Sequence, residues 1–266
     1  MFKRFETKLK TLFFLWKWVY NYSNGGMDME KKMKLGYSQT DYKGFWKLSD
    51  VFTQFAELAT SHAISFGGWD PKYKDTYGWI ISKMRVKVHQ MVRIEEEVTI
   101  RTWVTEGTHV VYPRHFEIYN ASGELVLEAT SNWTLLDLVR RRIAMPKRVG
   151  LSFPDNLPKA GNISIETDFL DEEGYEFVED RTVRFSDLDV NGHLNNARYV
   201  DWMCDVLGYE AFNDHYICDL SIQYKKETAP NGVLRLEKKI EGDTFKVRGM
   251  SGENIHFIAE GVWKKY

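Results

Sequence analysis

The sequence predicts an α+β fold built from two copies of one unit, in which an antiparallel sheet wraps around a central helix. Apolar residues at helical spacing are followed by a series of alternating strands, and this order then repeats along the 266 residues. Most strands alternate apolar and polar residues, which is typical of antiparallel sheets with one buried face. One amphipathic helix laid across that face covers it.

The first copy is predicted to span residues 36–137. Apolar residues recur at helical spacing over 52–66, Ser49 or Asp50 is the expected N-cap, and Gly67 and Gly68 end the run. Alternating apolar positions then predict strands that include residues 84–88, 98–100, 116–118 and 125–133.

The second copy, residues 175–266, repeats this plan with a shorter helix. Apolar residues at 200, 203, 204 and 207 predict that helix, with Asn195 or Asn196 as the N-cap and Gly208 at its end. Alternation then predicts strands that include residues 220–224, 234–236, 245–247 and 255–263. A sheet wrapped on one central helix is called a hotdog, so the sequence predicts a tandem double hotdog.

Two segments fall outside the copies. Residues 138–174 contain three prolines and little periodicity, and we expect them to link the halves. Residues 1–35 are expected to be a flexible N-terminal extension. Its apolar run at 11–16 is far shorter than a membrane span, so stable membrane insertion is not expected. An interfacial anchor and a loose tail before a functional start at Met27 are the alternatives.

The composition limits the classes of partner and cofactor. The formal net charge of −2 gives no global basic field, so nucleic acid is not an expected partner. Cys204 and Cys218 occur without a CxxC motif or zinc-like spacing, which fits a reducing compartment. We therefore expect a cytoplasmic protein without a structural metal, and nothing in the sequence calls for a cofactor.

Four polar residues of the second copy have no equivalent in the first when the helix-ending glycines are superposed. These residues are Asp189, Asn191, His193 and Glu227. Under this alignment their counterparts are Leu48, Asp50, Phe52 and Met91. Because a requirement of the fold should appear in both copies, the asymmetry predicts a functional cluster in the second copy and apolar walls from the first.

Structural explanations exist for the same residues. Asp-x-Asn-x-His before a helix also makes a stable loop and cap, because Asn and Asp side chains bond backbone amides. Asn195 or Asn196 fits a plain N-cap. Glu227, next to two lysines, fits a solvated charge run. Cys204, on the apolar stripe of its helix, fits a small core residue.

The cluster also suits the hydrolysis of a thioester. That reaction needs a water molecule activated for attack on a carbonyl, and hydrogen-bond donors where negative charge develops. An oriented histidine can activate the water, and the free amides at a helix N-terminus can stabilise the charge. The polar loop around His193 runs directly into the predicted second helix.

Residues 186–202, SDLDVNGHLNNARYVDW, closely resemble the second-half signature of acyl-acyl-carrier-protein thioesterases, a double-hotdog family that releases free fatty acids. Segments 48–67, 79–86 and 132–137 resemble the first half of that family, so the likeness covers about residues 36–266. The resemblance implies hydrolysis of fatty acyl-acyl-carrier-protein thioesters in fatty acid biosynthesis, with an acyl carrier protein as partner.

The resemblance also implies roles for particular residues. Asp189, Asn191 and His193 match the family's catalytic Asp-x-Asn-x-His, and Glu227 matches its catalytic glutamate. Where the plant pattern has a cysteine after that glutamate, this sequence has Thr228. We therefore favour a general-base route in which Glu227 or His193 activates water, Asn191 holds the water or the carbonyl, and Asp189 orients the site.

Supporting roles remain open for Asn195, Asn196 and Thr228, the last as an alternative nucleophile that would need strong activation. Phe52, Phe55 and Trp79 are expected to close the acyl tunnel, which leaves the chain length undetermined. Two fused halves can supply the pairing that single hotdogs obtain by dimerising, so the sequence leaves a monomer open beside the homodimer that we favour.

Other functions compete with this one. An acyl-coenzyme A thioesterase would use the same chemistry on a different handle. Recognition of an acidic carrier protein would need a basic patch, for which Lys225, Lys226 and residues 140–142 are candidates. A hotdog hydroxyacyl dehydratase or a non-catalytic acyl-binding module is the alternative from a different class.

Overall fold

Two halves of similar layout make up the structure, a computed structural model that describes residues 20–23, 27–155, 157–165, 169 and 173–266. The first half contains β1 (Tyr20–Ser23), β2 (Asp28–Lys34), α2 (Leu48–Ser65), β3 (Tyr77–Val88), β4 (Glu97–Val104), β5 (Tyr112–Asn120), β6 (Leu125–Asp137) and the short β7 (Arg142–Ile143). The second half contains β8 (Glu176–Thr182), α3 (Asn196–Leu207), β9 (His215–Tyr224), β10 (Val233–Glu241), β11 (Thr244–Ser251) and β12 (Asn254–Lys265).

In the described residues the strands form one twelve-stranded sheet with the order β1-β2-β4-β5-β6-β3-β9-β12-β11-β10-β8, and β7 pairs with β6. Read outward from the centre, β3-β6-β5-β4-β2 of the first half matches β9-β12-β11-β10-β8 of the second. The halves meet where β3 pairs antiparallel with β9, with Met84 opposite Ile222 and Val86 opposite Leu220. The predicted duplication and double-hotdog fold are confirmed.

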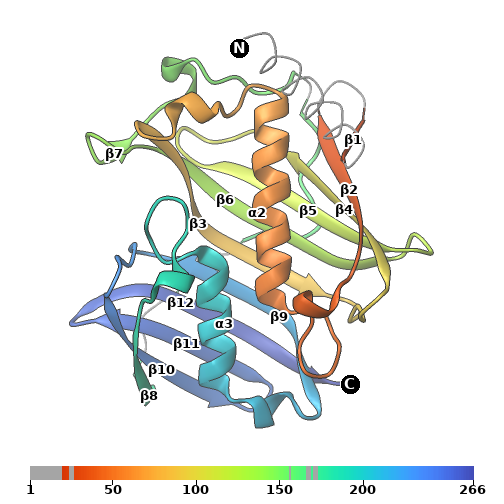
Figure 1. The fold of residues 1–266 in the computed structure, drawn as a ribbon, viewed down its shortest axis with the longest axis vertical. Coiled ribbons are helices and arrows are strands. Elements are labelled where there is room, and N and C mark those ends of the chain that lie inside the picture. The colour runs from red at the N-terminus through yellow and green to blue at the C-terminus, as the bar shows by residue number, and fades with distance from the viewer. Residues whose placement is uncertain (1–19, 24–26, 156, 166–168, 170–172) are drawn as a thin grey trace, which may run out of the picture.

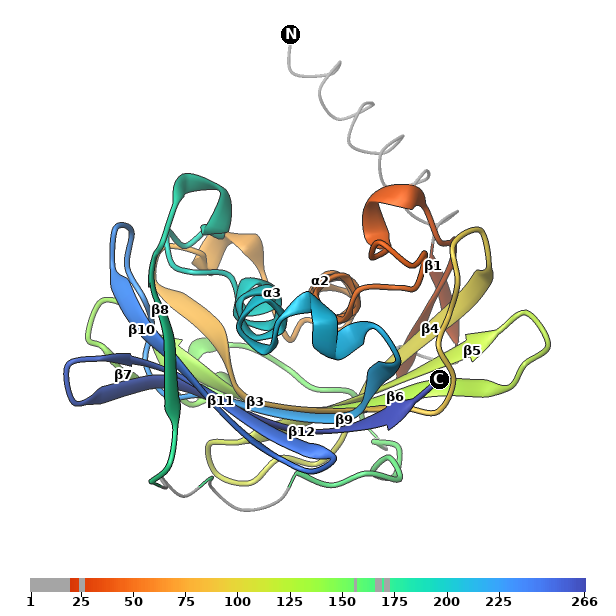
Figure 2. The same cartoon turned by 90° about the horizontal axis from the view of Figure 1, so that it is seen from below.

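Helices α2 and α3 lie in the concave face of the curved sheet. Figure 1 shows α2 and α3 with their axes roughly aligned and α3 beside the lower end of α2, and Figure 2 shows the sheet wrapping around the pair. Val51, Phe55 and Leu58 of α2 are almost fully buried, and the Phe55 ring stacks on Phe116 of β5 with centroids 4.2 Å apart. Burying each such side chain stabilises the fold by about 1.5–3 kcal/mol.

The N-terminus of α2 differs from the prediction. Lys47 is the N-cap in place of Ser49 or Asp50, and its side chain makes no capping hydrogen bond. Because the helix begins at Leu48, Asp50 already lies in the first turn, where its carboxylate accepts a hydrogen bond from Nε1 of Trp46 at 2.7 Å. The acidic side chain therefore fixes an aromatic residue of the preceding loop.

Helix α3 begins and ends where the sequence predicts. Asn195 is the N-cap, with Oδ1 accepting from the backbone N–H of Ala197 at 2.9 Å, and Gly208 follows the last helical residue. This helix has 12 residues, whereas α2 has 18. At about 3.6 residues per turn the two helices differ in length by nearly two turns.

The first hotdog begins before the predicted boundary at residue 36. Strand β2 pairs antiparallel with β4 over its whole length, and Met29 and Leu35 are buried in the core. The strand was hidden in the sequence DMEKKMK because it lies near the edge of the sheet and carries charged side chains. The expectation of flexibility for residues 1–19 and 24–26 falls outside the described residues.

Within the predicted linker, residues 138–174, the described residues 157–165 run along the convex face of the sheet (Figure 2), whereas Ser152 and Phe153 pack against the C-terminal end of α2. The carbonyl of Lys159 accepts from Nε1 of Trp103 at 2.9 Å, and that of Ile163 accepts from Oγ1 of Thr130 at 2.8 Å. The described part of this segment is mostly irregular, and Lys159 and Ile163 bind the outer surface of the first half. Within the described ranges, no helix has the length and apolar character needed to cross a membrane.

Candidate active site

The loop before α3, residues 189–195, folds around the carboxylate of Asp189; we call it the Asp189 loop. Oδ1 of Asp189 accepts from the backbone N–H of Asn191 at 2.8 Å and from that of His193 at 3.2 Å. Its backbone N–H donates to the carbonyl of His193 at 2.9 Å. Gly192 supplies the positive φ of +75° that this turn requires. Asp189 therefore fixes the positions of the two polar residues that follow it.

Glu227 reaches the Asp189 loop from the segment after β9. Its Oε2 lies 3.5 Å from Nε2 of His193, and the two side chains are 43% and 39% exposed. The backbone holds the segments together, because the N–H of Leu194 donates to the carbonyl of Thr228 at 3.0 Å. Asn191 joins the group through its Nδ2, which donates to Asp189 Oδ2 at 3.3 Å. The structure thus brings all four predicted residues into one cluster.

Thr228 is held away from solvent, with only 2% of its surface exposed. Its hydroxyl lies 2.9 Å from the hydroxyl of Tyr199 and 2.8 Å from Nδ1 of His256. Burial lowers the pKa of His256, assisted by the positive charge of Lys226, so its imidazole is neutral near pH 7. Burial also raises the pKa of Tyr199 to about 12. This neutral network fixes the segment that carries Glu227.

Tyr199 and His256 contribute to the site although their spacing in the sequence does not identify them. Tyr199 lies on the buried side of α3 and His256 lies on β12, so only the fold brings them to Thr228. Asn195 caps α3, and the carbonyl of Asn196 accepts from the hydroxyl of Tyr224 at 3.0 Å. Both asparagines therefore help to position the start of the helix.

The loop before α2, residues 41–47, has the same hydrogen bonds as the Asp189 loop; we call it the Asp41 loop. Oδ1 of Asp41 accepts from the backbone N–H groups of Lys43 and Phe45, both at 2.9 Å. The backbone N–H of Asp41 donates to the carbonyl of Phe45 at 2.8 Å, and Gly44 has φ of +78°. The two loops are therefore equivalent parts of a duplicated unit.

This equivalence corrects three of the four counterparts in the sequence alignment. Asp41, Lys43 and Phe45, and not Leu48, Asp50 and Phe52, stand where the second half has Asp189, Asn191 and His193. Superposing the ends of the helices misplaced the loops because α2 is longer than α3. The pairing of Met91 with Glu227 holds, since the N–H of Trp46 donates to the carbonyl of Val92 as that of Leu194 does to Thr228.

The corrected comparison separates the roles of the four residues. An aspartate that binds two backbone amides is present in both halves, so the loop fold itself requires it. The amide, the imidazole and the second carboxylate are present only in the second half, where Lys43, Phe45 and Met91 are their counterparts. Asn191, His193 and Glu227 are thus the groups that distinguish the two loops chemically.

A cavity of about 300 Å³ opens beside the Asp189 loop; we call it the Asn191 cavity. Its lining includes Val190 and Asn191 of the loop, Ala59 and Ala63 of α2, and the aromatic side chains of Phe66, Trp79, Tyr112, Trp133 and Phe153. The first half therefore supplies apolar walls beside a polar edge from the second. Of the three residues expected to close this space, Trp79 lines it, whereas Phe52 and Phe55 are buried in the core.

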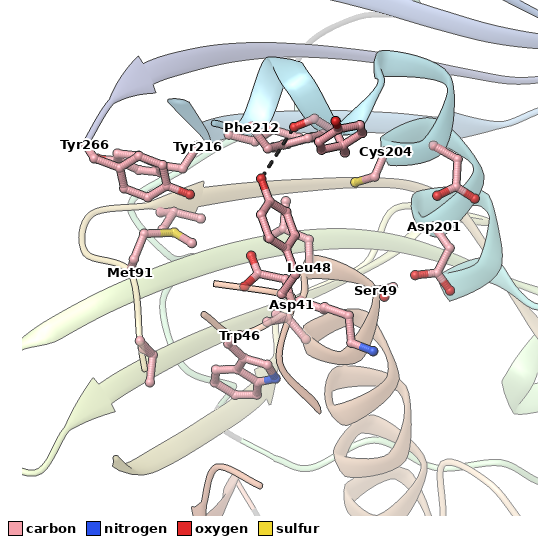
Figure 3. A pocket seen from close by; sticks show the side chains of 18 of the residues that line it. Asp41, Trp46, Leu48, Ser49, Met91, Asp201, Cys204, Phe212, Tyr216 and Tyr266 are labelled. Carbon is pink, nitrogen blue, oxygen red and sulfur yellow. Dashed lines mark hydrogen bonds between the residues drawn. The ribbon is translucent and has the colours of Figure 1, made fainter. Parts of the chain in front are cut away.

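A second cavity, of about 530 Å³, occupies the equivalent place beside the Asp41 loop (Figure 3). Figure 3 shows Trp46, Leu48, Met91 and Phe212 around it, with Cys204 of α3 on one side. Burial raises the pKa of the Cys204 thiol, which therefore stays protonated. The larger cavity is less suited to chemistry, because the counterparts of His193 and Glu227 at the Asp41 loop are Phe45 and Met91, which are apolar.

Contacts to the other half close the edge of the second cavity. The hydroxyl of Tyr42 donates to the carbonyl of Tyr209 at 3.5 Å and to Oδ1 of Asn213 at 3.4 Å. Lys43 also donates to the carbonyl of Asn213. Val190, the counterpart of Tyr42, is fully exposed, so the Asp189 loop presents its tip to solvent.

Two further features of the site are its lack of a metal-binding cluster in the described residues and the exposed basic residues near Glu227. Among the described residues, no group of three or more His, Cys, Asp and Glu side chains is arranged to hold a metal ion. Lys225 and Lys226, next to Glu227, are exposed, as are residues 140–142 at the β7 hairpin. The backbone N–H groups of both lysines donate to the carbonyl of His256, at 2.8 and 3.1 Å.

Comparison with known proteins identifies related sequences and folds. Sequence models named "Acyl-ACP thioesterase N-terminal domain" and "Acyl-ACP thioesterase C-terminal domain" match residues 26–149 and 171–261. A palmitoyl-acyl carrier protein thioesterase of Cuphea hookeriana is 27% identical over 201 residues, covering 70% of this chain and 48% of that protein. A dodecanoyl-[acyl-carrier-protein] hydrolase of Umbellularia californica is 25% identical over 206 residues, covering 72% and 54%. Both relatives are chloroplastic, and this chain spans about half their length.

Two solved structures share the fold. An acyl-ACP thioesterase from Bacteroides thetaiotaomicron superposes with a TM-score of 0.80 at 19% identity, covering 90% of this chain and 98% of that one. A 12:0-ACP thioesterase from Umbellularia californica also superposes with a TM-score of 0.80, at 20% identity, covering 92% of this chain and 100% of that one.

Proposed function

Because the chain belongs to the acyl-ACP thioesterase family, we propose that it hydrolyses fatty acyl-acyl-carrier-protein thioesters to free fatty acid and carrier protein. The observation that carries this proposal is the pairing of His193 with Glu227 at 3.5 Å, found in one half of a duplicated fold, at a loop whose Val190 and Asn191 line an apolar cavity. The relatives are named for the same reaction. Fatty acid biosynthesis would supply such substrates.

The acyl chain enters the Asn191 cavity, where each methylene removed from water contributes about 0.8 kcal/mol. This places the thioester near the Asp189 loop. Glu227 or His193 accepts a proton from water while the water oxygen bonds to the carbonyl carbon. The donors for the oxyanion are the side-chain N–H of Asn191 that is not bonded to Asp189 and the N–H groups at the start of α3 that Asn195 does not cap. The carbon–sulfur bond then breaks, and the leaving thiolate takes the proton from the base.

Water is favoured as the nucleophile over the hydroxyl of Thr228. That hydroxyl is 2% exposed and engaged with Tyr199 and His256, so attack on a substrate carbonyl would require both hydrogen bonds to be rearranged. Glu227 and His193 are partly open to solvent, which allows water to reach them. Asp189 acts by holding the backbone of the loop.

An acyl carrier protein is the proposed handle, because the exposed Lys225 and Lys226 adjoin Glu227 and would attract an acidic partner. The test is kcat/KM on acyl-carrier-protein and acyl-coenzyme A substrates of the same chain length. Lys225→Glu with Lys226→Glu should reduce activity on the carrier-protein substrate by about tenfold or more. Lys264→Glu with Lys265→Glu, a pair at the far end of β12, is the matched control.

Free thiol release tests the reaction itself. The purified protein should release thiol from acyl-acyl carrier protein, and release from coenzyme A substrates should be slower. No thiol from either substrate would refute the hydrolase proposal. Loss of water from a hydroxyacyl substrate in its place would identify a dehydratase. Binding of acyl chains without any turnover would identify a binding module.

We further propose a cytoplasmic location and a homodimer. The location rests on Cys204 and Cys218, which are both free thiols, as expected in a reducing compartment. The homodimer follows from the prevalence of two-fold assemblies, although the β3–β9 pairing already joins two hotdogs within one chain. Light scattering at several protein concentrations measures the oligomeric state directly.

A further inference from the structure

A buried cation lies in the wall of the Asn191 cavity. Arg114, on β5, lines the cavity but is only 5% exposed, in contrast to the exposed Asn191 at the loop edge. The cavity thus extends from a solvent-facing amide to a buried guanidinium. Most of the other lining residues are aromatic, apolar or small, and the other cation, Lys74, is exposed, so a buried positive charge is the unusual feature of this space.

The hydrogen bonds of Arg114 use only part of its donor capacity. Nη1 donates to Nδ1 of His62 at 3.0 Å and to Oγ1 of Thr102 at 3.1 Å. Across the described residues, no carboxylate lies within 4.0 Å of the guanidinium, and Nε and Nη2 have no hydrogen-bond partner. A guanidinium has five N–H groups, so several remain available.

These remaining groups face open space. Among the described residues, Arg114 has no nitrogen that is fully buried and also lacks a hydrogen bond. Because Nε and Nη2 lack a hydrogen bond, they must be in contact with open space. The space that Arg114 lines is the Asn191 cavity. Burial lowers the pKa of Arg114 to about 9, so the side chain still carries its charge at neutral pH. The cavity therefore offers unused cationic donors.

A saturated chain that filled the cavity would seal these N–H groups from water without supplying an acceptor, which is unfavourable. A chain with an oxygen acceptor near its distal end would replace the lost water. On the basis of the proposed thioesterase activity, we propose that Arg114 selects acyl chains that carry a distal oxygen group, with carboxylate preferred over hydroxyl. Arg114 is then a specificity-determining residue at the end of the chain away from the thioester.

The test compares hydrolysis rates across matched substrates. Carrier protein is loaded with plain, ω-hydroxy and α,ω-dicarboxylic chains of 6 to about 14 carbons, because the depth of the cavity has to be sampled by length. At the length that reaches Arg114, the wild-type protein should hydrolyse the dicarboxylic chain at least about tenfold faster, by kcat/KM, than the plain chain. Arg114→Met should reverse this preference, and Arg114→Lys should retain part of it.

Lys87→Met is the matched control, because Lys87 is an exposed lysine of β3 that does not line the Asn191 cavity, so its removal should leave the ratio unchanged. Arg114→Met is expected to fold, since replacing a buried charge by an apolar side chain is often tolerated. The melting temperature of wild-type protein with free dicarboxylic or plain fatty acids gives a readout that needs no variant. It should rise more with the dicarboxylic acid.

The outcomes separate the two proposals. If the wild-type protein hydrolyses no acyl-carrier-protein substrate, the proposed function fails. If it prefers plain chains at every length, or if Arg114→Met leaves the ratio unchanged, hydrolysis stands and the role of Arg114 is refuted. If Arg114→Met only extends the accepted length of plain chains, the residue limits length and does not recognise oxygen, which also overturns the inference.

Discussion

Asp189 and Asp41 occupy equivalent positions, so replacing each in turn tests whether Asp189 holds its loop in place or takes part directly in the reaction. Replacing Asp189 by Ala removes a carboxylate that accepts two backbone N–H groups, at 2.8 and 3.2 Å. Replacing Asp41 by Ala removes the same pair in the first half, both at 2.9 Å. Hydrogen bonds to charged groups contribute about 1.5–3 kcal/mol each to stability. Because these loops are partly exposed to water, we expect values near the lower end of this range. With two such hydrogen bonds, each substitution should therefore cost about 3 kcal/mol of stability.

Activity should respond to only one of the two changes. Loss of the Asp189 carboxylate frees the backbone of Asn191 and His193, and a displacement of about 1 Å can reduce a rate by about 100-fold. Asp41→Ala should leave kcat within about threefold of wild type, because its loop lacks these groups. Asp189→Asn keeps one acceptor oxygen and should retain much of the activity.

Urea unfolding and kcat/KM on an acyl-carrier-protein substrate measure the two effects on the same samples. Equal stability losses with unequal activity losses are expected. The reasoning is refuted if Asp41→Ala reduces kcat as much as Asp189→Ala does. It is also refuted if Asp189→Asn removes activity without changing stability, because the carboxylate would then act directly in the reaction.

Three further predictions follow from the burial of particular side chains. Thr228→Ala should keep kcat within about tenfold of wild type while losing about 1–2 kcal/mol in urea unfolding; loss of all activity in a folded variant would identify a nucleophile. Cys204→Ala should remain active, and an inactive but folded variant would contradict its placement in the second cavity. Burial and the adjacent Arg114 lower the pKa of His115 to about 4, so the unfolded state alone gains its proton as pH falls below about 6.5. Stability should fall by about 2 kcal/mol from pH 6.5 to pH 5 for this reason, and His115→Gln should reduce that slope; an unchanged slope would contradict it.

The fold was largely predictable because its signal is periodic and repeated. Alternation located the inner strands of both halves, and Asn195 and Gly208 marked the ends of α3 correctly. Strand β2 was not predicted because a strand near the edge of the sheet that carries mostly charged side chains has little apolar alternation. The predicted N-cap of α2 was wrong because the actual N-cap, Lys47, makes no capping hydrogen bond with its side chain. A residue of this type at the N-cap cannot be recognised from the sequence.

The site was predictable where its residues are neighbours in the chain and less so where the fold assembles them. Asn191, His193 and Glu227 could be recognised, whereas Asp189 is now better understood through its equivalent, Asp41. Arg114 could not be found, since a lone arginine in a strand is usually exposed. Only the packing of β5 against α2 buries it beside the cavity.

The central claim is that hydrolysis uses the carboxylate found in only one of the two equivalent positions. Glu227→Gln and Met91→Gln place the same amide at these positions, and thiol release from acyl-acyl carrier protein measures both. Glu227→Gln should lower kcat by at least about 100-fold, whereas Met91→Gln should stay within about threefold of wild type. Full activity in folded Glu227→Gln, or equal losses in the two variants, would contradict the assignment.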